Sequence, residues 1–272
     1  MMDVEAAANF PTITPGVTES YRHGWQQLWK NFFELFLGLI IMLAIIIPIS
    51  IVIVIILAIF VPDYWIQQLI NYGLGFFIYG PIGFGWAYMT LRAVRNEKVE
   101  IQHLFQPFRR YGQAVLAYFL MYLIISIPFI ISTVVLILIY SLGVFLTILA
   151  VIFTIFLYCK LAFMPYILVD KEVNAIQAIK ASWNMTNGYA GKVFLIGLLG
   201  IPIAIAGVIC FIVGVIPATM WIYMAIASLY HAVDMRNRGV ANTTHTPLPG
   251  GSDSYSGERD RDIYHPNVQR QY

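Results

Sequence analysis

The chain has 272 residues, of which 60% are hydrophobic and only 11% are charged, and its formal net charge is +2. Soluble domains carry about 25% charged residues, so this composition excludes an ordinary soluble domain and predicts an all-α, polytopic membrane protein. The two cysteines lie in apolar runs without metal-ligand or redox spacing, and we therefore expect no metal and no cofactor.

The N-terminal part is predicted to contain an irregular segment and an amphipathic helix before the first membrane span. Residues 1–17 contain no Lys or Arg and no apolar core, so we expect an irregular segment without a cleavable signal peptide. From Thr18 onward, Tyr21, Trp25 and Leu28 recur at helical spacing and predict an amphipathic helix. The first apolar span follows at once and acts as the insertion signal.

Six transmembrane helices are predicted, because about 20 apolar helical residues cross a membrane. The expected spans are 35–61, 66–91, 112–140, 144–168 and two passes within 192–233. The expected turns lie at 61–65, at 141–143 and within 205–217. The second span is rich in glycine, which favours close helix packing but is also compatible with a broken helix that lines a pathway.

Two further amphipathic segments separate the pairs of spans. In 101–110, apolar residues including Phe105 share one stripe, and Pro107 is expected to split the segment into two short pieces. The third segment runs from Asp170, a predicted N-cap, to Gly188, a predicted left-handed C′ residue. On this segment an apolar stripe that includes Trp183 indicates a helix that lies on the membrane surface.

The fold expected is thus three transmembrane hairpins, each preceded by a cytoplasmic amphipathic interfacial helix. The three steps from a surface helix into the apolar span that follows it are predicted at Phe32, Tyr111 and Tyr189, with spacings of 111 − 32 = 79 and 189 − 111 = 78 residues. This spacing favours parallel repeats over 18–95, 99–169 and 171–233, although any unit of one surface helix and one hairpin has a similar length.

The distribution of basic residues predicts the topology. In the six-span arrangement, all sixteen Lys and Arg fall on the same side of the membrane as the two termini, whereas the three short turns on the other side have none. By the positive-inside rule, 18–233 is then a six-span domain of the cell membrane with both termini in the cytoplasm. The polar segment 235–272 lacks hydrophobic periodicity and is predicted to be a disordered cytoplasmic tail.

One stretch carries a resemblance to a known family. The motif K-L-A-F-M-P-Y-I-L-V-D, followed by A-I-Q-A-I-K-A-S-W-N-M-T-N-G, resembles the membrane domain of some prokaryotic glycerophosphodiester phosphodiesterases and related multi-pass proteins. The positions that match this pattern are Asp170, Ala178, Ser182 and Gly188. The resemblance implies the fold over about 18–233, but no phosphodiesterase activity, because the catalytic domain is absent.

The candidate functional residues are ionisable or aromatic groups near the membrane surface. Lys160 is the basic residue that lies well inside a span; it is expected to snorkel to the interface, with anion binding or pairing with Asp170 as the alternative. Trp25, Phe105 and Trp183 are expected to anchor at headgroup level, or to recognise a lipid. Arg109 and Arg110 could attract anionic lipid, or serve only as a topology signal.

The sequence contains no motif for catalysis and few ionisable groups at mid-membrane. We therefore expect a non-enzymatic scaffold or accessory protein that acts through membrane lipids or other membrane proteins, with no nucleic-acid partner. A transporter or channel for a small solute is the alternative function.

Overall fold

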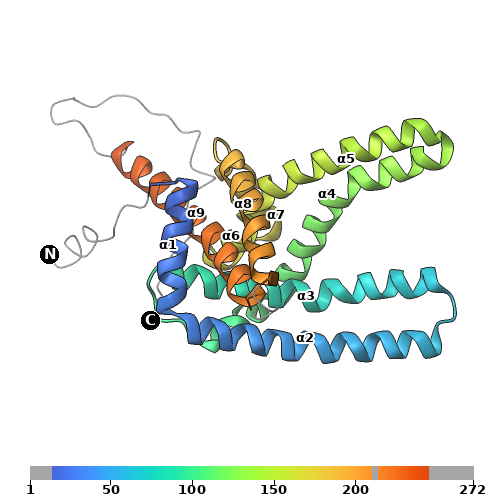
Figure 1. Cartoon of the computed structure of the whole chain (residues 1–272), viewed down its shortest axis with the longest axis horizontal. Helices are drawn as coiled ribbons and strands as arrows, with labels where there is room; N and C mark the ends of the chain where they lie inside the picture. The colour runs from blue at the N-terminus through green and yellow to red at the C-terminus, as the bar shows by residue number, and fades with distance from the viewer. Residues whose placement is uncertain (1–13, 210–213, 245–272) are drawn as a thin grey trace, which may run out of the picture. The chain divides into compact units, whose positions relative to one another are not determined.

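The computed structural model describes residues 14–209 and 214–244, and this part of the chain contains helices and no strand. The elements are α1 (Val17–Lys30), α2 (Phe32–Phe60), α3 (Tyr64–Val94), η2 (Ile101–Arg110), α4 (Tyr111–Leu138), α5 (Tyr140–Leu161), α6 (Met164–Asp170), α7 (Ala175–Met185), α8 (Ala190–Ile209) and α9 (Val215–Thr244). Figure 1 shows α2 with α3, and α4 with α5, as antiparallel pairs.

Within residues 14–209 and 214–244, five helical segments are long and apolar enough to cross a membrane, as expected of a multi-pass membrane protein. These segments are Phe32–Phe60, Ile101–Leu138, Tyr140–Asp170, Ala190–Ile209 and Val215–Gly239. The helix α3 is 31 residues long but is not among them, and its first third carries Gln67, Gln68 and Asn71. An all-helical fold with several candidate spans is therefore confirmed.

The long helices begin where the sequence pattern steps from polar to apolar. Three of them, α2, α4 and α8, start at Phe32, Tyr111 and Ala190, each shortly after a shorter helical segment, with the turn 186–189 between α7 and α8. The predicted steps at Phe32 and Tyr111 coincide with these starts, and the third differs by one residue. Each long helix thus follows a short one of different composition, namely α1, η2 or α7.

Local capping explains several helix ends and corrects one prediction. Asp63 caps α3, because its Oδ1 accepts hydrogen bonds from the backbone N–H of Trp65 at 2.8 Å and of Ile66 at 3.0 Å. The N-cap of α7 is Asn174, and Gln177 completes a capping box. The prediction that Asp170 would cap this helix is therefore wrong: Asp170 ends α6, and its carboxylate pairs elsewhere.

The turn after α7 matches the prediction in conformation but not in position. Gly188 has a φ of +80°, the left-handed region that glycine adopts without a steric penalty. The C-cap of α7 is Thr186, however, so the C′ residue is Asn187 and the predicted C′ residue, Gly188, lies one position beyond it.

Three other predicted boundaries differ from the structure. Pro107 lies inside one continuous 3₁₀ segment and does not split it, because the fixed φ of proline, about −65°, lies within the range of a 3₁₀ helix. The break between α4 and α5 is at Ile139 rather than at 141–143. The helix α9 continues to Thr244, past the predicted start of the tail, whereas 245–272 lies outside the described residues.

The predicted turn within 205–217 agrees with the two neighbouring helices. The helix α8 ends at Ile209 and α9 begins at Val215, and 210–213 lies outside the described residues. The two helices approach each other where a Cβ on Gly200 would lie 3.1 Å from the side chain of Ile222.

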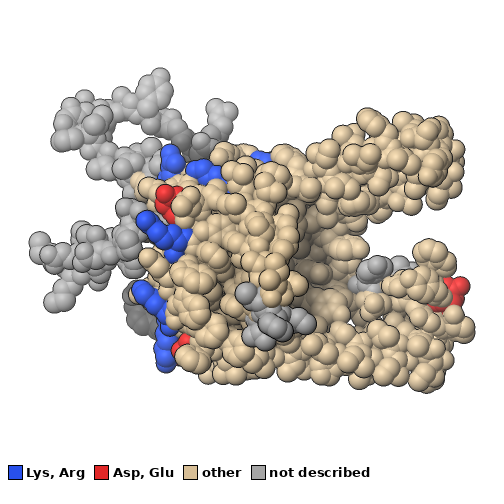
Figure 2. Space-filling view, viewed as in Figure 1, with Lys and Arg blue, Asp and Glu red and all other residues tan. Residues whose placement is uncertain are grey.

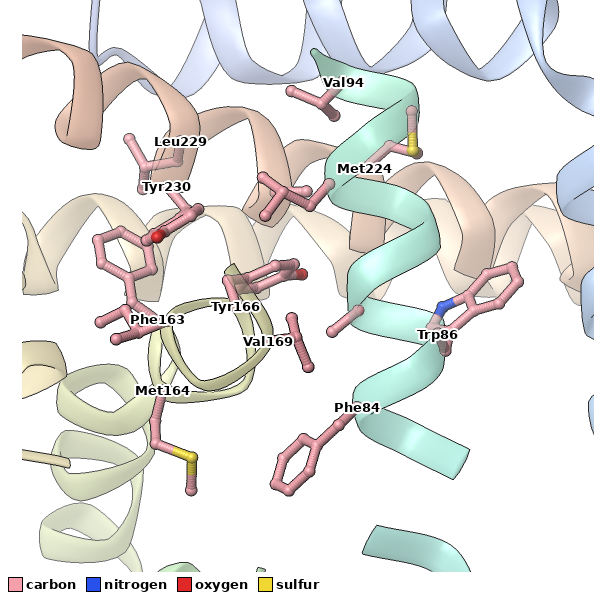
Figure 3. Packing of buried hydrophobic residues seen from close by; sticks show 14 of the residues in the cluster. Phe84, Trp86, Val94, Phe163, Met164, Tyr166, Val169, Met224, Leu229 and Tyr230 are labelled. Atoms are coloured by element: carbon pink, nitrogen blue, oxygen red, sulfur yellow. The ribbon is translucent and has the colours of Figure 1, made fainter. Parts of the chain in front are cut away.

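The buried core lies where α3, α6 and α9 meet, near the ends of the long helices (Figure 3). Phe163 and Tyr230 are fully buried, with their rings 5.6 Å apart, and Tyr166 stacks on Tyr230 at 5.4 Å. The helix α1 joins the same core: Tyr21 donates a hydrogen bond to the carbonyl oxygen of Ile196 in α8 at 2.7 Å. Aromatic burial of this kind contributes a large share of packing energy.

Glycines in α3 allow two neighbouring helices to approach closely. A Cβ on Gly85 would lie 1.9 Å from the carbonyl oxygen of Leu104 in η2, and one on Gly80 would lie 2.7 Å from the Cβ of Tyr118 in α4. At Gly83 nothing lies within 4 Å. The close contacts at Gly80 and Gly85 are those of a packing face.

Candidate functional site

A buried cluster of charges joins the ends of α3 and α6 to the interior of α9. Arg95 donates two hydrogen bonds to the carboxylate of Asp170, at 2.5 Å and 2.8 Å, and Tyr230 donates a third at 2.9 Å. Asp234 lies 3.0 Å from the ammonium of Lys171 and 3.8 Å from Arg95. The side chains of Asp170 and Asp234 are only 8% and 2% exposed, so these acids depend on their cationic partners.

Each member of this charge cluster comes from a comparable place in the chain. Arg95 follows the last residue of α3, Asp170 is the last residue of α6, and Asp234 lies ten residues before the end of α9 (244 − 234 = 10). The three residues lie at, or one residue after, the ends of the predicted repeats 18–95, 99–169 and 171–233. Burial alone would lower the pKa of Arg95, but the hydrogen bond and the charge of Asp170 outweigh burial and raise this pKa above its ordinary value.

Lys160 is held between two aromatic rings and an amide. It is 8% exposed, and its Nζ donates a hydrogen bond of 2.5 Å to Oδ1 of Asn187, in the turn after α7. The same nitrogen lies 5.3 Å from the ring centroid of Trp183 and 5.9 Å from that of Phe156, within cation–π range. The structure thus brings Lys160 and Trp183 together, while Asp170 pairs with Arg95.

The remaining predicted aromatic residues are exposed and lie on separate elements. Trp25 is 41% exposed and packs against Trp221 of α9, with a centroid distance of 4.6 Å. Phe105 is 42% exposed, and its ring lies 6.0 Å from that of Phe108 on η2. These residues do not converge with Lys160 on one site.

Arg109 and Arg110 line a cavity of about 270 Å³ between η2, the first turn of α4 and the connection from α6 to α7. Gln113 and Glu172 are further polar residues of its wall. Leu168 also lines this cavity. Asp170 does not line it, and the Asp170 carboxylate binds Arg95 instead.

Sequence reasoning missed the residues that surround Asp170. In the sequence, Arg95 and Lys171 are only two of the sixteen basic residues that predict the topology, and Tyr230 and Asp234 belong to no recognisable motif. One signal was present: Asp234 is an acid at the end of a long apolar stretch, and a carboxylate in such a place needs a cationic partner.

One contact between a serine and a histidine resembles catalytic geometry, but a substrate cannot reach it. Ser228 Oγ lies 3.1 Å from Nδ1 of His23, and Gln27 lies 3.4 Å from Nε2 of the same ring. Ser228 is fully buried, so a substrate cannot reach its hydroxyl, and the group on the other ring nitrogen is an amide rather than an acid. In the described residues, no group of three His, Cys, Asp or Glu side chains could hold a metal ion.

Comparisons of the chain with protein-family models, curated proteins and solved structures found no match. The helices themselves define the class, which is that of a multi-pass membrane protein. The resemblance to phosphodiesterase membrane domains stays a prediction.

Proposed function

We propose that this chain is a non-enzymatic scaffold or accessory protein of the cell membrane that acts through contacts with lipids or other membrane proteins. The observation that carries the proposal is the position of the charges. No Lys, Arg, Asp or Glu occurs within 35–62, 64–91, 111–159 or 193–233. Transporters usually place ionisable groups near mid-membrane, where they bind ions or substrates.

The packing at the charged end supports a fixed bundle. Asp170 and Asp234 are buried there with their cationic partners, and the aromatic core of Phe163, Tyr166 and Tyr230 lies beside them. Opening a path along the bundle would separate buried ion pairs, each of which costs several kcal/mol to break. Such an arrangement favours a scaffold over a carrier that alternates between two states.

The apolar helices beyond this end offer a large contact surface. Exposed side chains on α2 and α5 include Ile51 at 53% and Ile152 at 61%. Figure 2 shows the Lys and Arg side chains gathered at one end of the molecule and almost none over the far ends of the helix pairs. Apolar surface of this extent fits lipid or partner helices rather than water.

We further propose six spans, with α3 as the sixth. It is 31 residues long, and the hydroxyl of Tyr79 lies 2.9 Å from that of Ser50 in α2, which supports a paired insertion of the two helices. The turn that contains Asp63 then faces outside, and both termini face the cytoplasm. Exposed aromatic residues support interfacial positions for α1, η2 and α7.

Cysteine labelling in intact cells tests the topology. In a variant with Cys159 and Cys210 replaced by Ser, a cysteine at Tyr64 should react with an impermeant thiol reagent from outside. A cysteine at Lys98, whose side chain is 84% exposed, should react only after permeabilisation. Labelling of both positions from the same side would contradict the six-span arrangement.

Photo-crosslinking in native membranes tests the contact surface. A benzoylphenylalanine at Ile51 or Ile152 should give discrete lipid or protein adducts, whereas the same group at the buried Met224 should give none. Equal yields at exposed and buried positions would refute a contact role.

A flux assay tests the transporter alternative. Proteoliposomes that contain the purified chain should take up ions, sugars and amino acids no faster than empty liposomes. Saturable uptake of one solute would overturn the scaffold proposal.

A further inference from the structure

The cavity beside η2 has an unusual combination of charges. Arg109, Arg110 and Glu172 all line its wall. The three formal charges sum to +1. No ion pair within 4.0 Å joins either arginine to Glu172 among the described residues. Because these opposite charges share a cavity without pairing, both the arginines and the glutamate are available to a ligand.

The two arginines are suited to a phosphate group. Arg109 and Arg110 are exposed, and the single hydrogen bond of the Arg110 side chain is a long one of 3.4 Å to Asn174. Planar guanidinium groups bind phosphate through two parallel hydrogen bonds. The arginines also precede α4, a helix of 28 residues whose N-terminal dipole favours an anion at the same place.

Glu172 provides the opposite charge in a constrained position. Its φ of +49° lies in the left-handed region, which is sterically unfavourable for a residue with a Cβ. Strain of this kind persists only where the surrounding structure imposes it, and it tends to occur at ligand sites. Glu172 is exposed, and its carboxylate carries the charge that pairs with a primary amine.

The surroundings place the cavity at the level of lipid headgroups. Phe105 and Phe108 on η2 are exposed, and the ring of Phe108 stacks on Tyr111 at the start of α4. Exposed aromatic rings prefer the membrane–water interface, and the apolar helix α4 continues from there. The volume of about 270 Å³ is below the roughly 300–1,000 Å³ of sites for drug-sized ligands, so a headgroup rather than a whole lipid fits.

We propose that this cavity binds the headgroup of a zwitterionic aminophospholipid, with the phosphate at Arg109 and Arg110 and the amine at Glu172. The inference rests on the proposed membrane placement and names the lipid class that the chain recognises. It is distinct from the scaffold role, because a transporter could carry the same site.

The test is native mass spectrometry of the full chain, released from detergent after exposure to phosphatidylethanolamine, phosphatidylcholine or phosphatidylglycerol. We expect phosphatidylethanolamine to be retained in preference to the other two. The double variant Arg109→Gln/Arg110→Gln should lower its apparent affinity at least tenfold. Glu172→Gln should shift the preference toward phosphatidylglycerol, because the site then lacks the acid that binds the amine.

Matched controls separate the site from general surface charge. Lys98→Gln/Lys180→Gln removes two exposed charges that do not line the cavity and should leave retention unchanged. All variants are compared at equal thermal stability; if the arginine variant unfolds, the exposed Glu172→Gln alone decides the question.

Three outcomes would overturn the inference. One is retention that does not depend on Arg109 and Arg110, and another is a lipid preference that Glu172→Gln leaves unchanged. The third is equally tight binding of soluble phosphoethanolamine or inorganic phosphate, which would indicate a site for a free phosphate compound. None of these results bears on the flux assay, so failure of this site and failure of the scaffold proposal remain distinguishable.

Discussion

Asp170→Asn removes one charge from the buried cluster with almost no change in side-chain shape. In the parent chain, the carboxylate accepts two hydrogen bonds from Arg95, at 2.5 Å and 2.8 Å, and one from Tyr230 at 2.9 Å. The variant leaves Arg95 with Asp234, 3.8 Å away, as its remaining acid, and this acid is shared with Lys171. We therefore expect a buried cation with incomplete compensation.

The expected magnitude follows from the burial of the pair. Removal of one partner of a buried ion pair costs about 3–5 kcal/mol, and the residual contact with Asp234 places Asp170→Asn near the lower end, at about 3 kcal/mol. For a protein of this size, 1 kcal/mol shifts the unfolding midpoint by about 2–4 °C, so the midpoint should fall by about 6–12 °C. Thermal unfolding in detergent, followed by intrinsic fluorescence, measures this shift.

Two comparisons make the reasoning refutable. Glu97→Gln breaks the more exposed ion pair with Arg92 and should cost less than about 1 kcal/mol. The double variant Arg95→Met/Asp170→Leu replaces the pair by apolar groups and should be less destabilised than either single change. An Asp170→Asn protein that unfolds within about 2 °C of the parent would refute the importance of the cluster.

Three further changes test other contacts by thermal unfolding. Lys160→Met should cost about 1–2 kcal/mol, because a charge-assisted hydrogen bond is lost while burial of a charge is relieved; Lys180→Met on the exposed face should be neutral. Gly85→Ala should cost about 1–3 kcal/mol through overpacking, whereas Gly83→Ala, with open space around it, should be neutral or stabilising, and equal effects would contradict the packing role. Burial, and then the charge of Lys30, lower the pKa of His23 below 6.5, so the folded state binds a proton less readily than the unfolded state. The contribution of His23 to the free energy of unfolding should therefore be fully present above pH 6.5 and fall as the pH drops below that value. His23→Gln should flatten that slope, and an unchanged slope would assign the pH dependence to another group.

The sequence by itself determined the class of protein and the starts of the two long helices α2 and α4. Uninterrupted apolar stretches can satisfy their backbone hydrogen bonds in a membrane only as helices, so composition alone predicts spans. The polar-to-apolar steps at Phe32 and Tyr111 coincide with helix starts for the same reason. Local chemistry also predicted the left-handed Gly188, because glycine tolerates that conformation best.

Only the tertiary structure decided which charges meet. Arg95, Asp170 and Asp234 are separated by 64 residues or more in the chain, and no local pattern records that the ends of α3 and α6 meet the interior of α9 (170 − 95 = 75; 234 − 170 = 64). Asp170 was expected at a helix N-terminus because a carboxylate is suited to that place, but the bidentate pairing with Arg95 is the stronger interaction in a buried setting. The cavity of Arg109 and Glu172 depends in the same way on the docking of η2 beside the α6–α7 connection. Helical periodicity specifies which residues share one face, whereas contacts between distant helices are fixed only by the packing of the whole bundle.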